Sequence, residues 1–199
     1  QTPIEEEEKE ELKIKTISTR GELDEFEQAN IEKAVEWSLR TNPSIQKILT
    51  VQFVKEVHKK MFGEVWGWAG KFRKTNKNIG VDKDQIEQEL RKLMGDCKFW
   101  IDHSVYPEDE IAIRFKHRIV KTHPFPNGNG RHSRLCADIL IHKGFKKEIF
   151  SWGANNTSDQ SETRTKYLKA IYEADNGNIM PLIIFEKKKK NHTTPGGIE

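Results

Sequence analysis

Hydrophobic residues recur every three or four positions along most of the chain, which is the spacing that places them on one face of an α-helix. Three such segments cover residues 24–40, 49–61 and 83–100. The first is expected to bury Ile31, Ala34, Val35 and Leu39, with Phe26 and Trp37 adding bulk. The other two are expected to bury Phe53, Val54, Val57, Met61, Ile86, Leu90, Leu93, Met94 and Cys97. The pattern predicts three amphipathic helices in the first half of the chain.

The second half is predicted to open with a helix from Pro107 to about Thr122. A proline followed by acidic residues is typical of a helix start, because the first turn favours negative charge. Pro124 disfavours helical dihedral angles in the residue before it, so His123 is expected at or just beyond the end of this helix.

Two more helices are predicted after this point. One should begin near Gly130 and end at Gly144, and the other should cover residues 161–174 before a turn at Asn176 and Gly177. With about six or seven helices in all, the fold class is predicted to be mainly α.

Residues 62–82, FGEVWGWAGKFRKTNKNIGVD, interrupt the helical pattern. They contain several glycines and show no helical period, which is typical of a loop. We predict a loop followed by a short two-stranded element at about residues 71–82, which would form a small β-hairpin.

Composition and charge narrow the class of protein. The 199 residues are 35% hydrophobic and 33% charged, yet five Trp and ten Phe argue against a disordered chain. The net charge is only +3, so no nucleic-acid partner is expected. We interpret the acidic segment 1–16 and the basic tail 187–199 as solvated extensions of one domain spanning residues 17–186.

The two cysteines, Cys97 and Cys136, are far apart in the sequence, which excludes a disulfide framework and a cysteine zinc site. Reduced thiols are typical of cytosolic proteins, so a cytoplasmic location is expected. The chain shows no secretory signal and no apolar run of membrane-spanning length, so no membrane association is expected.

The stretch PFPNGNGR has the composition of an anion-binding loop. Glycine and asparagine tolerate positive φ angles, so the N–H groups of Gly128, Asn129 and Gly130 can converge on one concavity. The next helix begins there and adds unpaired N–H groups and its positive dipole end. Arg131 and Arg134 share one side of that helix. This combination favours a site for more than one phosphate over a plain helix corner with solvent-exposed arginines.

His123 stands at the edge of the same loop. A neutral imidazole, whose reference pKa is about 6.5, can take a proton from a hydroxyl that attacks phosphorus. The other histidines show no metal-ligand spacing such as HExxH. We interpret them as structural: His58, His103, His117, His132, His142 and His192.

The stretch HPFPNGNGRHSR resembles the signature HPFx(D/E)GNGRxxR of the Fic (filamentation induced by cAMP) domain family. It departs at one fixed position, where Asn127 stands in place of Asp or Glu. Together with VWGWAGKFRKTNKNIG and STRGELDEFEQANI, it is similar to the mobile mystery protein B subgroup. The resemblance covers roughly residues 17–186 and implies a Fic-fold helical bundle with a β-hairpin flap at about 71–82.

The resemblance implies a protein adenylyltransferase, which moves AMP from ATP to a serine, threonine or tyrosine hydroxyl of a target protein. His123 would be the catalytic base, opposite the leaving pyrophosphate, and Phe125 would pack inward to orient the loop. The family role of binding the ATP phosphates would fall to Gly128, Asn129, Gly130, Arg131 and Arg134. Glycine at 130 favours transfer of AMP over transfer of phosphate.

The flap would clamp an extended target segment through main-chain hydrogen bonds. Its candidate target-binding residues are Lys77, Asn78, Ile79 and Gly80. For Ile79, a role in the core is an equal alternative to contact with target or nucleotide.

The acid that Asn127 replaces binds Mg²⁺ in the family. An amide offers one neutral oxygen, so Asn127 is expected to bind the ion only weakly. Phosphates could hold Mg²⁺ with help from Asn127, or another acid could take its place. Alternatively the metal site is lost, and the chain is a nucleotide-binding or regulatory module with weak or no catalysis. A purely structural helical protein is the least favoured class, since the histidine and both arginines are intact.

Many Fic proteins are inhibited by a helix bearing (S/T)xxxE(G/N), whose Glu pairs with the second signature arginine. The stretch STRGE matches the first part of this motif, but Leu23 departs from Gly or Asn. Glu22 and Glu27 are the candidate inhibitory residues, and a solvated helix face is the alternative for each. The family also implies a bacterial, toxin-like role with an antitoxin-like protein partner.

Overall fold

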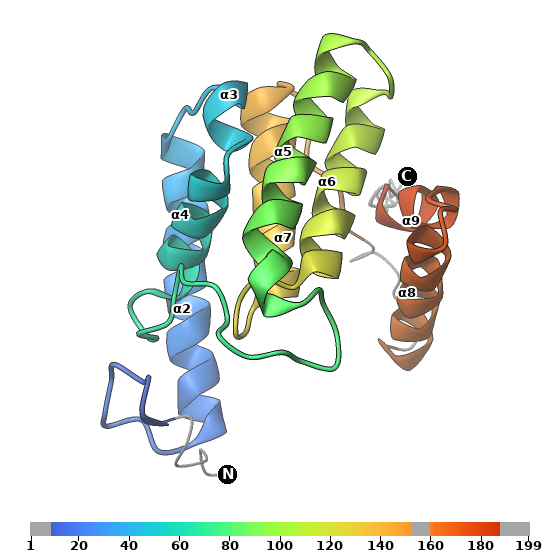
Figure 1. Ribbon diagram of the computed structural model, residues 1–199. Coiled ribbons are helices and arrows are strands. Elements are labelled where there is room, and N and C mark those ends of the chain that lie inside the picture. The colour runs from blue at the N-terminus through green and yellow to red at the C-terminus, as the bar shows by residue number, and fades with distance from the viewer. Residues whose placement is uncertain (1–8, 153–159, 188–199) are drawn as a thin grey trace, which may run out of the picture. The chain divides into compact units, whose positions relative to one another are not determined.

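Helices form almost all of the regular structure in residues 9–152 and 160–187, the parts of the chain that the computed structural model describes (Figure 1). The chain divides into two compact units, Gln1–Lys147 and Glu148–Glu199. The first unit contains α2 (Arg20–Arg40), α3 (Ile45–Ile48), α4 (Val51–Phe62), η1 (Lys83–Gln85), α5 (Ile86–Asp102), α6 (Glu108–Thr122), α7 (Asn129–Ile139) and η2 (Leu140–Gly144). The second contains α8 (Gln160–Asp175) and α9 (Met180–Glu186). The prediction of a mainly α fold is confirmed.

The predicted domain boundaries at residues 17 and 186 stay predictions. Most of the acidic N-terminal residues, 1–8, and of the basic tail, 188–199, lie outside the described ranges.

The predicted apolar faces of α4 and α5 are buried. None of their expected core residues exposes more than 4% of its surface: Phe53, Val54, Val57, Met61, Ile86, Leu90, Leu93, Met94 and Cys97. The start of α4 is fixed by Thr50, whose hydroxyl accepts a hydrogen bond from the Phe53 N–H at 3.1 Å. Periodicity and capping chemistry therefore agree in this part of the chain.

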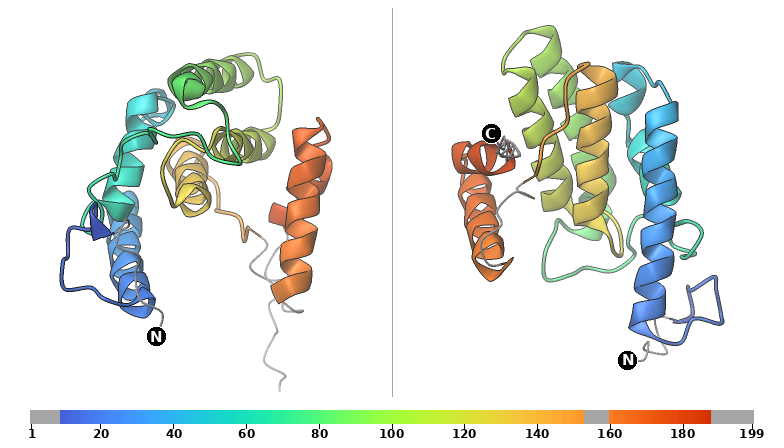
Figure 2. Two further views of the ribbon diagram at one scale, coloured as in Figure 1. Left: turned by 60° about the horizontal axis from the view of Figure 1, so that its bottom comes forward. Right: turned by 180° about the vertical axis from the view of Figure 1, so that it is seen from behind.

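Helix α7 lies in the middle of the first unit, between the pair α2 and α4 and the pair α5 and α6 (Figure 2). It packs chiefly on α6 and α4. Its core-facing residues are Leu135, Cys136, Ala137 and Ile139. As predicted, α6 ends at Thr122 with His123 just beyond it, and α7 starts at Asn129, close to the predicted Gly130. The segment between α6 and α7 is therefore held at the end of a packed helix pair.

The predicted buried face of α2 is only partly right, because Ala34 is buried but two of its neighbours on that face are not. Val35 and Leu39 are 40% and 62% exposed. The Asn30 side chain instead donates to the Lys60 carbonyl at 2.9 Å and accepts the Glu64 N–H at 3.0 Å. Hydrogen bonds thus fasten this helix to α4, and apolar periodicity could not reveal them. The face that is actually buried carries Leu23, Glu27, Asn30, Ala34 and Ser38.

The two-stranded element predicted at residues 71–82 is not formed, and these residues are an irregular loop, which we call the flap loop. The N–H of Arg73 donates to the Pro124 carbonyl at 2.9 Å, and the N–H of Val81 to the Thr122 carbonyl at 3.3 Å. The main-chain N–H groups near both ends of the flap loop therefore bond to the end of α6 and the residues after it, and not to each other as in a β-ladder.

The side chain of Arg73 holds the flap loop together in place of a strand ladder. It is only 3% exposed. Its guanidinium donates to the carbonyls of Thr75 at 2.9 Å and of Val81, and Nε donates to the His123 carbonyl at 2.7 Å. A guanidinium carries five N–H donors in a fixed fork, so one side chain can satisfy several carbonyls at once.

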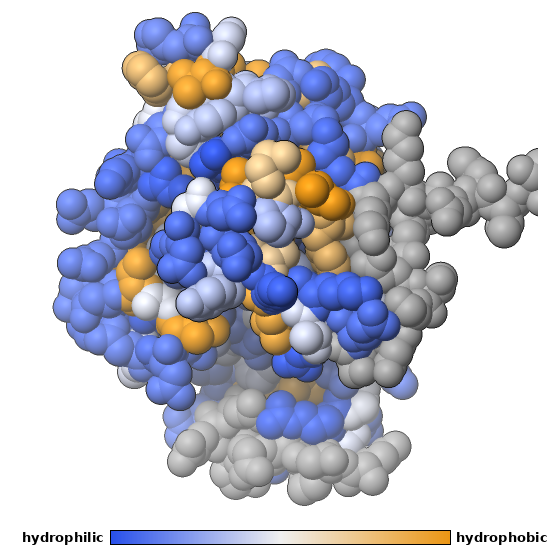
Figure 3. All heavy atoms as spheres, turned by 90° about the vertical axis from the view of Figure 1, so that its right-hand side faces the viewer, coloured by the Kyte–Doolittle hydropathy of each residue, from blue (hydrophilic) through white to orange (hydrophobic). Residues whose placement is uncertain are grey.

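In the second unit, α8 packs against α9. The Trp152 N–H donates to the Glu186 carbonyl at 3.1 Å. Large apolar side chains are exposed at Leu168, Tyr172, Met180 and Ile184. Figure 3 shows the face that is on the right in Figure 1, where hydrophobic residues are exposed among hydrophilic ones. Among the described residues, no helix is both long enough and apolar enough to cross a membrane.

We expect Asn30→Ala to lower the free energy of unfolding by about 1–3 kcal/mol, because it removes two partly buried hydrogen bonds, to the Lys60 carbonyl and from the Glu64 N–H. The matched change Val35→Ala on the exposed face of the same helix should alter it by no more than about 0.5 kcal/mol. Urea unfolding of both variants measures the difference. Equal losses would contradict the polar attachment of α2.

Candidate functional site

The segment between α6 and α7 contains two residues in the left-handed region of backbone space. His123 has φ 52° and Gly128 has φ 78°. A side chain at Gly128 would collide with the ring of Phe62, so only glycine fits there. Gly130 lies inside α7 without positive φ, so the expected nest of several left-handed residues is reduced to Gly128 and the first turn of the helix.

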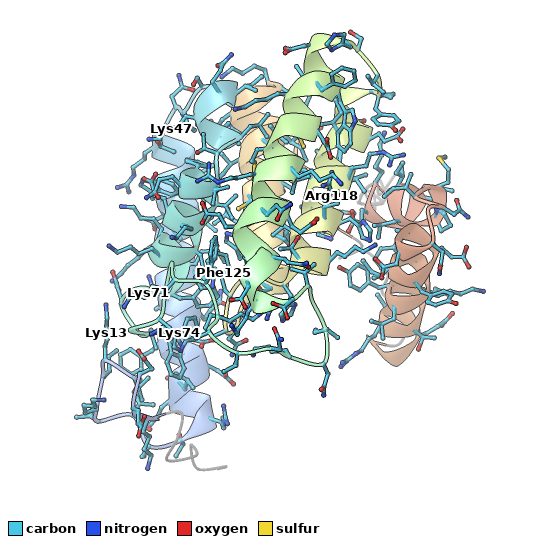
Figure 4. The ribbon with its side chains drawn as sticks, in the orientation of Figure 1. Lys13, Lys47, Lys71, Lys74, Arg118 and Phe125 are labelled. Atoms are coloured by element: carbon cyan, nitrogen blue, oxygen red, sulfur yellow. The ribbon has the colours of Figure 1, made fainter. Side chains whose placement is uncertain are left out.

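Phe125 and Asn129 fix the course of this segment. Phe125 is fully buried, as expected, and lies between the helices in Figure 4. The amide of Asn129 accepts the N–H of Phe125 and donates to its carbonyl, both at 2.9 Å. The Asn129 side chain is therefore engaged within the loop, and only its backbone N–H at the start of α7 could serve the predicted phosphate site.

His58 links three parts of the site. Its ring stacks on Phe125, with 3.7 Å between centroids and 10° between planes. Nδ1 accepts the Gly70 N–H at 2.9 Å, so Nε2 carries the proton and donates to the Asn127 carbonyl at 3.0 Å. Burial lowers the pKa of His58 to about 2, which keeps the ring neutral. The structural role predicted for His58 is thus a positioning role.

The backbone of His123 is held by the flap loop. Arg73 donates to the His123 carbonyl, and Gly80, with φ 96°, packs against the side chain. A Cβ at Gly80 would lie 2.7 Å from the His123 Cβ. Glycine at position 80 therefore lets the flap loop approach the histidine closely, and its expected contact with a target stays a prediction.

The imidazole of His123 is half-buried and surrounded by positive charge. Burial lowers its pKa below 6.5, the charges of Lys77 and Arg73 lower it further, and the Val120 carbonyl opposes the shift. Nδ1 is buried and makes no hydrogen bond of normal geometry within the described residues. The ring is therefore neutral at neutral pH and able to accept a proton.

An open pocket of about 560 Å³ lies beside His123. It brings the candidate base together with most of the predicted phosphate-binding residues, but Arg134 does not line it. Asn78 and Ile79 do not line it either, and Ile79 is 61% exposed, so the alternative of a core role for Ile79 is excluded. The lining residues are Lys77, His123, Pro126, Asn127, Gly128, Asn129, Gly130 and Arg131.

Arg131 is paired with one of the two candidate inhibitory residues. Its Nη1 donates to Oε2 of Glu27 at 3.1 Å, and its guanidinium lies over the Phe62 ring at 5.1 Å. Oε1 of the same carboxylate accepts the Trp66 Nε1–H at 2.7 Å. Glu27 is thus buried and held by two donors, which explains why an acidic residue faces inward on α2.

The other candidate, Glu22, is engaged at the start of α2. It forms a capping box with Thr19, and it also accepts the Ser18 N–H at 2.9 Å. These hydrogen bonds lower the pKa of its carboxyl group. A second pocket, of about 510 Å³, is lined by Glu27 and Arg131 among others, and Glu22 lines neither pocket.

His58 and Arg73 are functional residues that the sequence analysis missed. Each acts on main-chain carbonyls of residues at least 49 positions away. Nothing in the residue types or in the local spacing indicates such partners. A tertiary structure is needed to find them.

The donor set of the pocket does not fit a protein-bound Mg²⁺ ion. Oδ1 of Asn127 already accepts the Gly128 N–H at 2.7 Å, and no aspartate or glutamate lines the pocket beside His123. Among the described residues, no group of three or more His, Cys, Asp or Glu side chains is arranged to hold a metal.

Comparisons with known proteins show relatives in sequence and in fold. The chain is 25% identical over 168 residues to "Protein adenylyltransferase Fic" of Nematostella vectensis, covering 82% of this chain and 37% of that protein. The chain thus spans about a third of the length of the curated relatives it matches.

Solved structures share the fold. The BepC protein of Bartonella tribocorum, solved with bound AMPPNP, has a TM-score of 0.61 at 20% identity, over 93% of this chain and all of that one (100%). An N-terminal Fic domain from Bartonella quintana, solved with bound ADP, has a TM-score of 0.63 at 20% identity, over 86% of each chain. The model of the Fic/DOC family matches residues 48–141, which include α4 to α7 and the pocket beside His123. Residues 48–141 of this chain therefore match the Fic/DOC family, and the fold is that of solved Fic domains.

Proposed function

We propose that this chain is a protein adenylyltransferase that moves AMP from ATP to a hydroxyl side chain of a target protein. The observation that carries the proposal is the pocket in which a neutral His123 faces the start of α7, Gly128 and Arg131. The family match and the adenylyltransferase name of the relatives support it. The helix start offers N–H donors to phosphate oxygens, and His123 offers a base beside them.

In the proposed reaction, the target oxygen attacks the α-phosphorus of ATP and forms a new P–O bond. The bond from the α-phosphorus to the oxygen that bridges to the β-phosphate breaks, and pyrophosphate leaves with that electron pair. The hydroxyl proton passes to His123 and then to solvent. Gly128, Asn129, Gly130 and Arg131 bind the phosphates, and Arg134 binds the terminal phosphate when the nucleotide extends to it.

The flap loop carries the proposed contacts with the target, through Lys77, Asn78, Ile79 and Gly80. The exposed tip of this loop supports the proposal, because an apolar side chain such as Ile79 is free to contact a partner. The target is proposed to present a serine, threonine or tyrosine. A toxin-like role in a bacterium, an antitoxin-like partner and kinship with the mobile mystery protein B subgroup are proposals from the sequence resemblance alone, and a cytoplasmic location is proposed from the two cysteines.

A nucleotide-binding or regulatory module without catalysis is the second candidate function. Asn127 favours it, because the amide is engaged by Gly128 and the pocket supplies no carboxylate for Mg²⁺. Any Mg²⁺ would have to be held by the phosphates of the nucleotide itself, where it would neutralise their charge.

Glu27 is proposed to inhibit the site by occupying Arg131. A carboxylate and a phosphate compete for the same guanidinium fork, so phosphate binding would require Arg131 to leave Glu27. The pairing involves the first signature arginine, whereas the family motif pairs its glutamate with the second. Glu22, held in the capping box, is the weaker candidate.

Incubation with α-labelled ATP and Mg²⁺ or Mn²⁺ tests the proposed transfer. Wild type is expected to label itself or an added protein, and His123→Ala is expected to lose at least about a hundredfold in rate, because the base is gone. Label that appears only in Asn127→Asp would support the nucleotide-binding module. Label that survives in His123→Ala would contradict the role of His123.

Release of Arg131 is tested with Glu27→Gln, which keeps a hydrogen-bond acceptor for Trp66 but removes the negative charge. Self-labelling should rise about fivefold or more. Glu22→Gln is the matched control on the same helix, and its capping box is retained, so no gain is expected. Equal rates in wild type and Glu27→Gln would dismiss the inhibitory role.

The pH dependence of kcat/KM reports the protonation of His123 in the free protein. Because its pKa is lowered, the neutral base is present above a pKa that lies below 6.5, and activity should fall only as the pH drops through that value. Initial labelling rates from about pH 4.5 to about pH 8 measure the midpoint. A midpoint at or above 6.5 would contradict the environment described for His123.

A further inference from the structure

The pocket beside His123 has a surplus of positive charge and no carboxylate. Its charged lining residues are Lys77 and Arg131. Arg131 is already paired with Glu27 at 3.1 Å. Lys77 is therefore the cation of this pocket that is not paired with a carboxylate of the described residues.

The ammonium of Lys77 is held close to the phosphate-binding loop. Nζ donates to the Pro126 carbonyl at 2.5 Å, across 49 positions of sequence. The flap loop that carries Lys77 is anchored at its base by Arg73, which bonds to the His123 carbonyl. Because Lys77 and Arg73 both bond to the segment after α6, the charge of Lys77 is kept near the start of α7.

The neutral residue at position 127 suits this arrangement. The carbonyl that Nζ contacts belongs to Pro126, directly before Asn127. Asn127 lines the same pocket as Lys77, so a carboxylate at 127 would compete with phosphate for the ammonium, whereas an amide leaves the charge available. A lysine ammonium is a compact point charge with three donors, and it is a common ligand of phosphate oxygens.

We propose that Lys77 supplies the positive charge that a metal ion would otherwise bring to the phosphates of ATP, so that this site binds nucleotide without a divalent cation. The inference rests on the proposed nucleotide site. It goes further because it assigns the positive charge that faces the phosphates to Lys77 of the flap loop.

Calorimetric titration of ATP into the full chain, with EDTA and then with Mg²⁺, tests this inference. In EDTA, wild type should bind ATP within about threefold of its affinity in Mg²⁺, and Lys77→Gln should weaken binding by about tenfold or more. Lys77→Arg keeps the charge and should remain within about threefold of wild type. Lys74→Gln is the matched control, since Lys74 is an exposed lysine of the same loop that does not line the pocket (Figure 4).

The double variant Lys77→Gln with Asn127→Asp should bind ATP only when Mg²⁺ is present, because it exchanges the lysine charge for a metal ligand. Lys77 is exposed, so these changes should leave the fold intact, as circular dichroism can verify.

The possible failures are distinct. If ATP binds only with Mg²⁺ and Lys77→Gln matches wild type, the role of Lys77 is overturned and the proposed adenylyl transfer stands. If wild type binds no ATP under either condition, the proposed nucleotide site itself is contradicted, and the inference falls with it. Equal weakening by Lys77→Gln and Lys74→Gln would reduce the effect to general surface charge and would also overturn the inference.

Discussion

The site depends on the stacking of Phe125 against His58, because this contact closes the segment between α6 and α7 onto α4. The same imidazole bonds to the Gly70 N–H and the Asn127 carbonyl, so it joins the loop after α4 to the phosphate-binding segment. Its strongly lowered pKa keeps it neutral, and the donor and acceptor roles of its two nitrogens stay fixed. The positions of His123 and of the first turn of α7 follow from this closure.

Buried polar side chains hold parts of this fold together by hydrogen bonds, where other folds use strand pairing or apolar helix faces. Arg73 satisfies carbonyls of the flap loop and of the segment after α6 in place of a β-ladder. Asn30 fastens α2 to the end of α4. Such groups are costly to bury unless each finds a partner, so these contacts define one arrangement and disfavour sliding or repacking.

Three side chains determine the charge near the pocket: the acidic Glu27, the basic Lys77 and the neutral Asn127. Glu27 engages Arg131 from the side of α2, and Lys77 approaches from the flap loop. Asn127, in the segment between α6 and α7, is neutral, and its side-chain oxygen accepts the Gly128 N–H. Under the proposed function, a nucleotide entering this pocket would exchange the Glu27 carboxylate on Arg131 for phosphate oxygens, which would couple nucleotide binding to the contact between Arg131 and α2.

The sequence alone predicted most of the longer helices, the apolar faces of α4 and α5, and the turn between α6 and α7 with His123 at its edge, because these features depend on local spacing and on proline and glycine chemistry. It predicted a partly wrong face for α2 and a hairpin where a loop exists. Both depend on long-range hydrogen bonds from Asn30 and Arg73, which leave no local periodic signal. Only the tertiary structure decided that Glu27 contacts Arg131 and that Lys77 contacts Pro126. These residues are 104 and 49 positions apart, and they meet because helices and loops pack together, not because they are near in sequence.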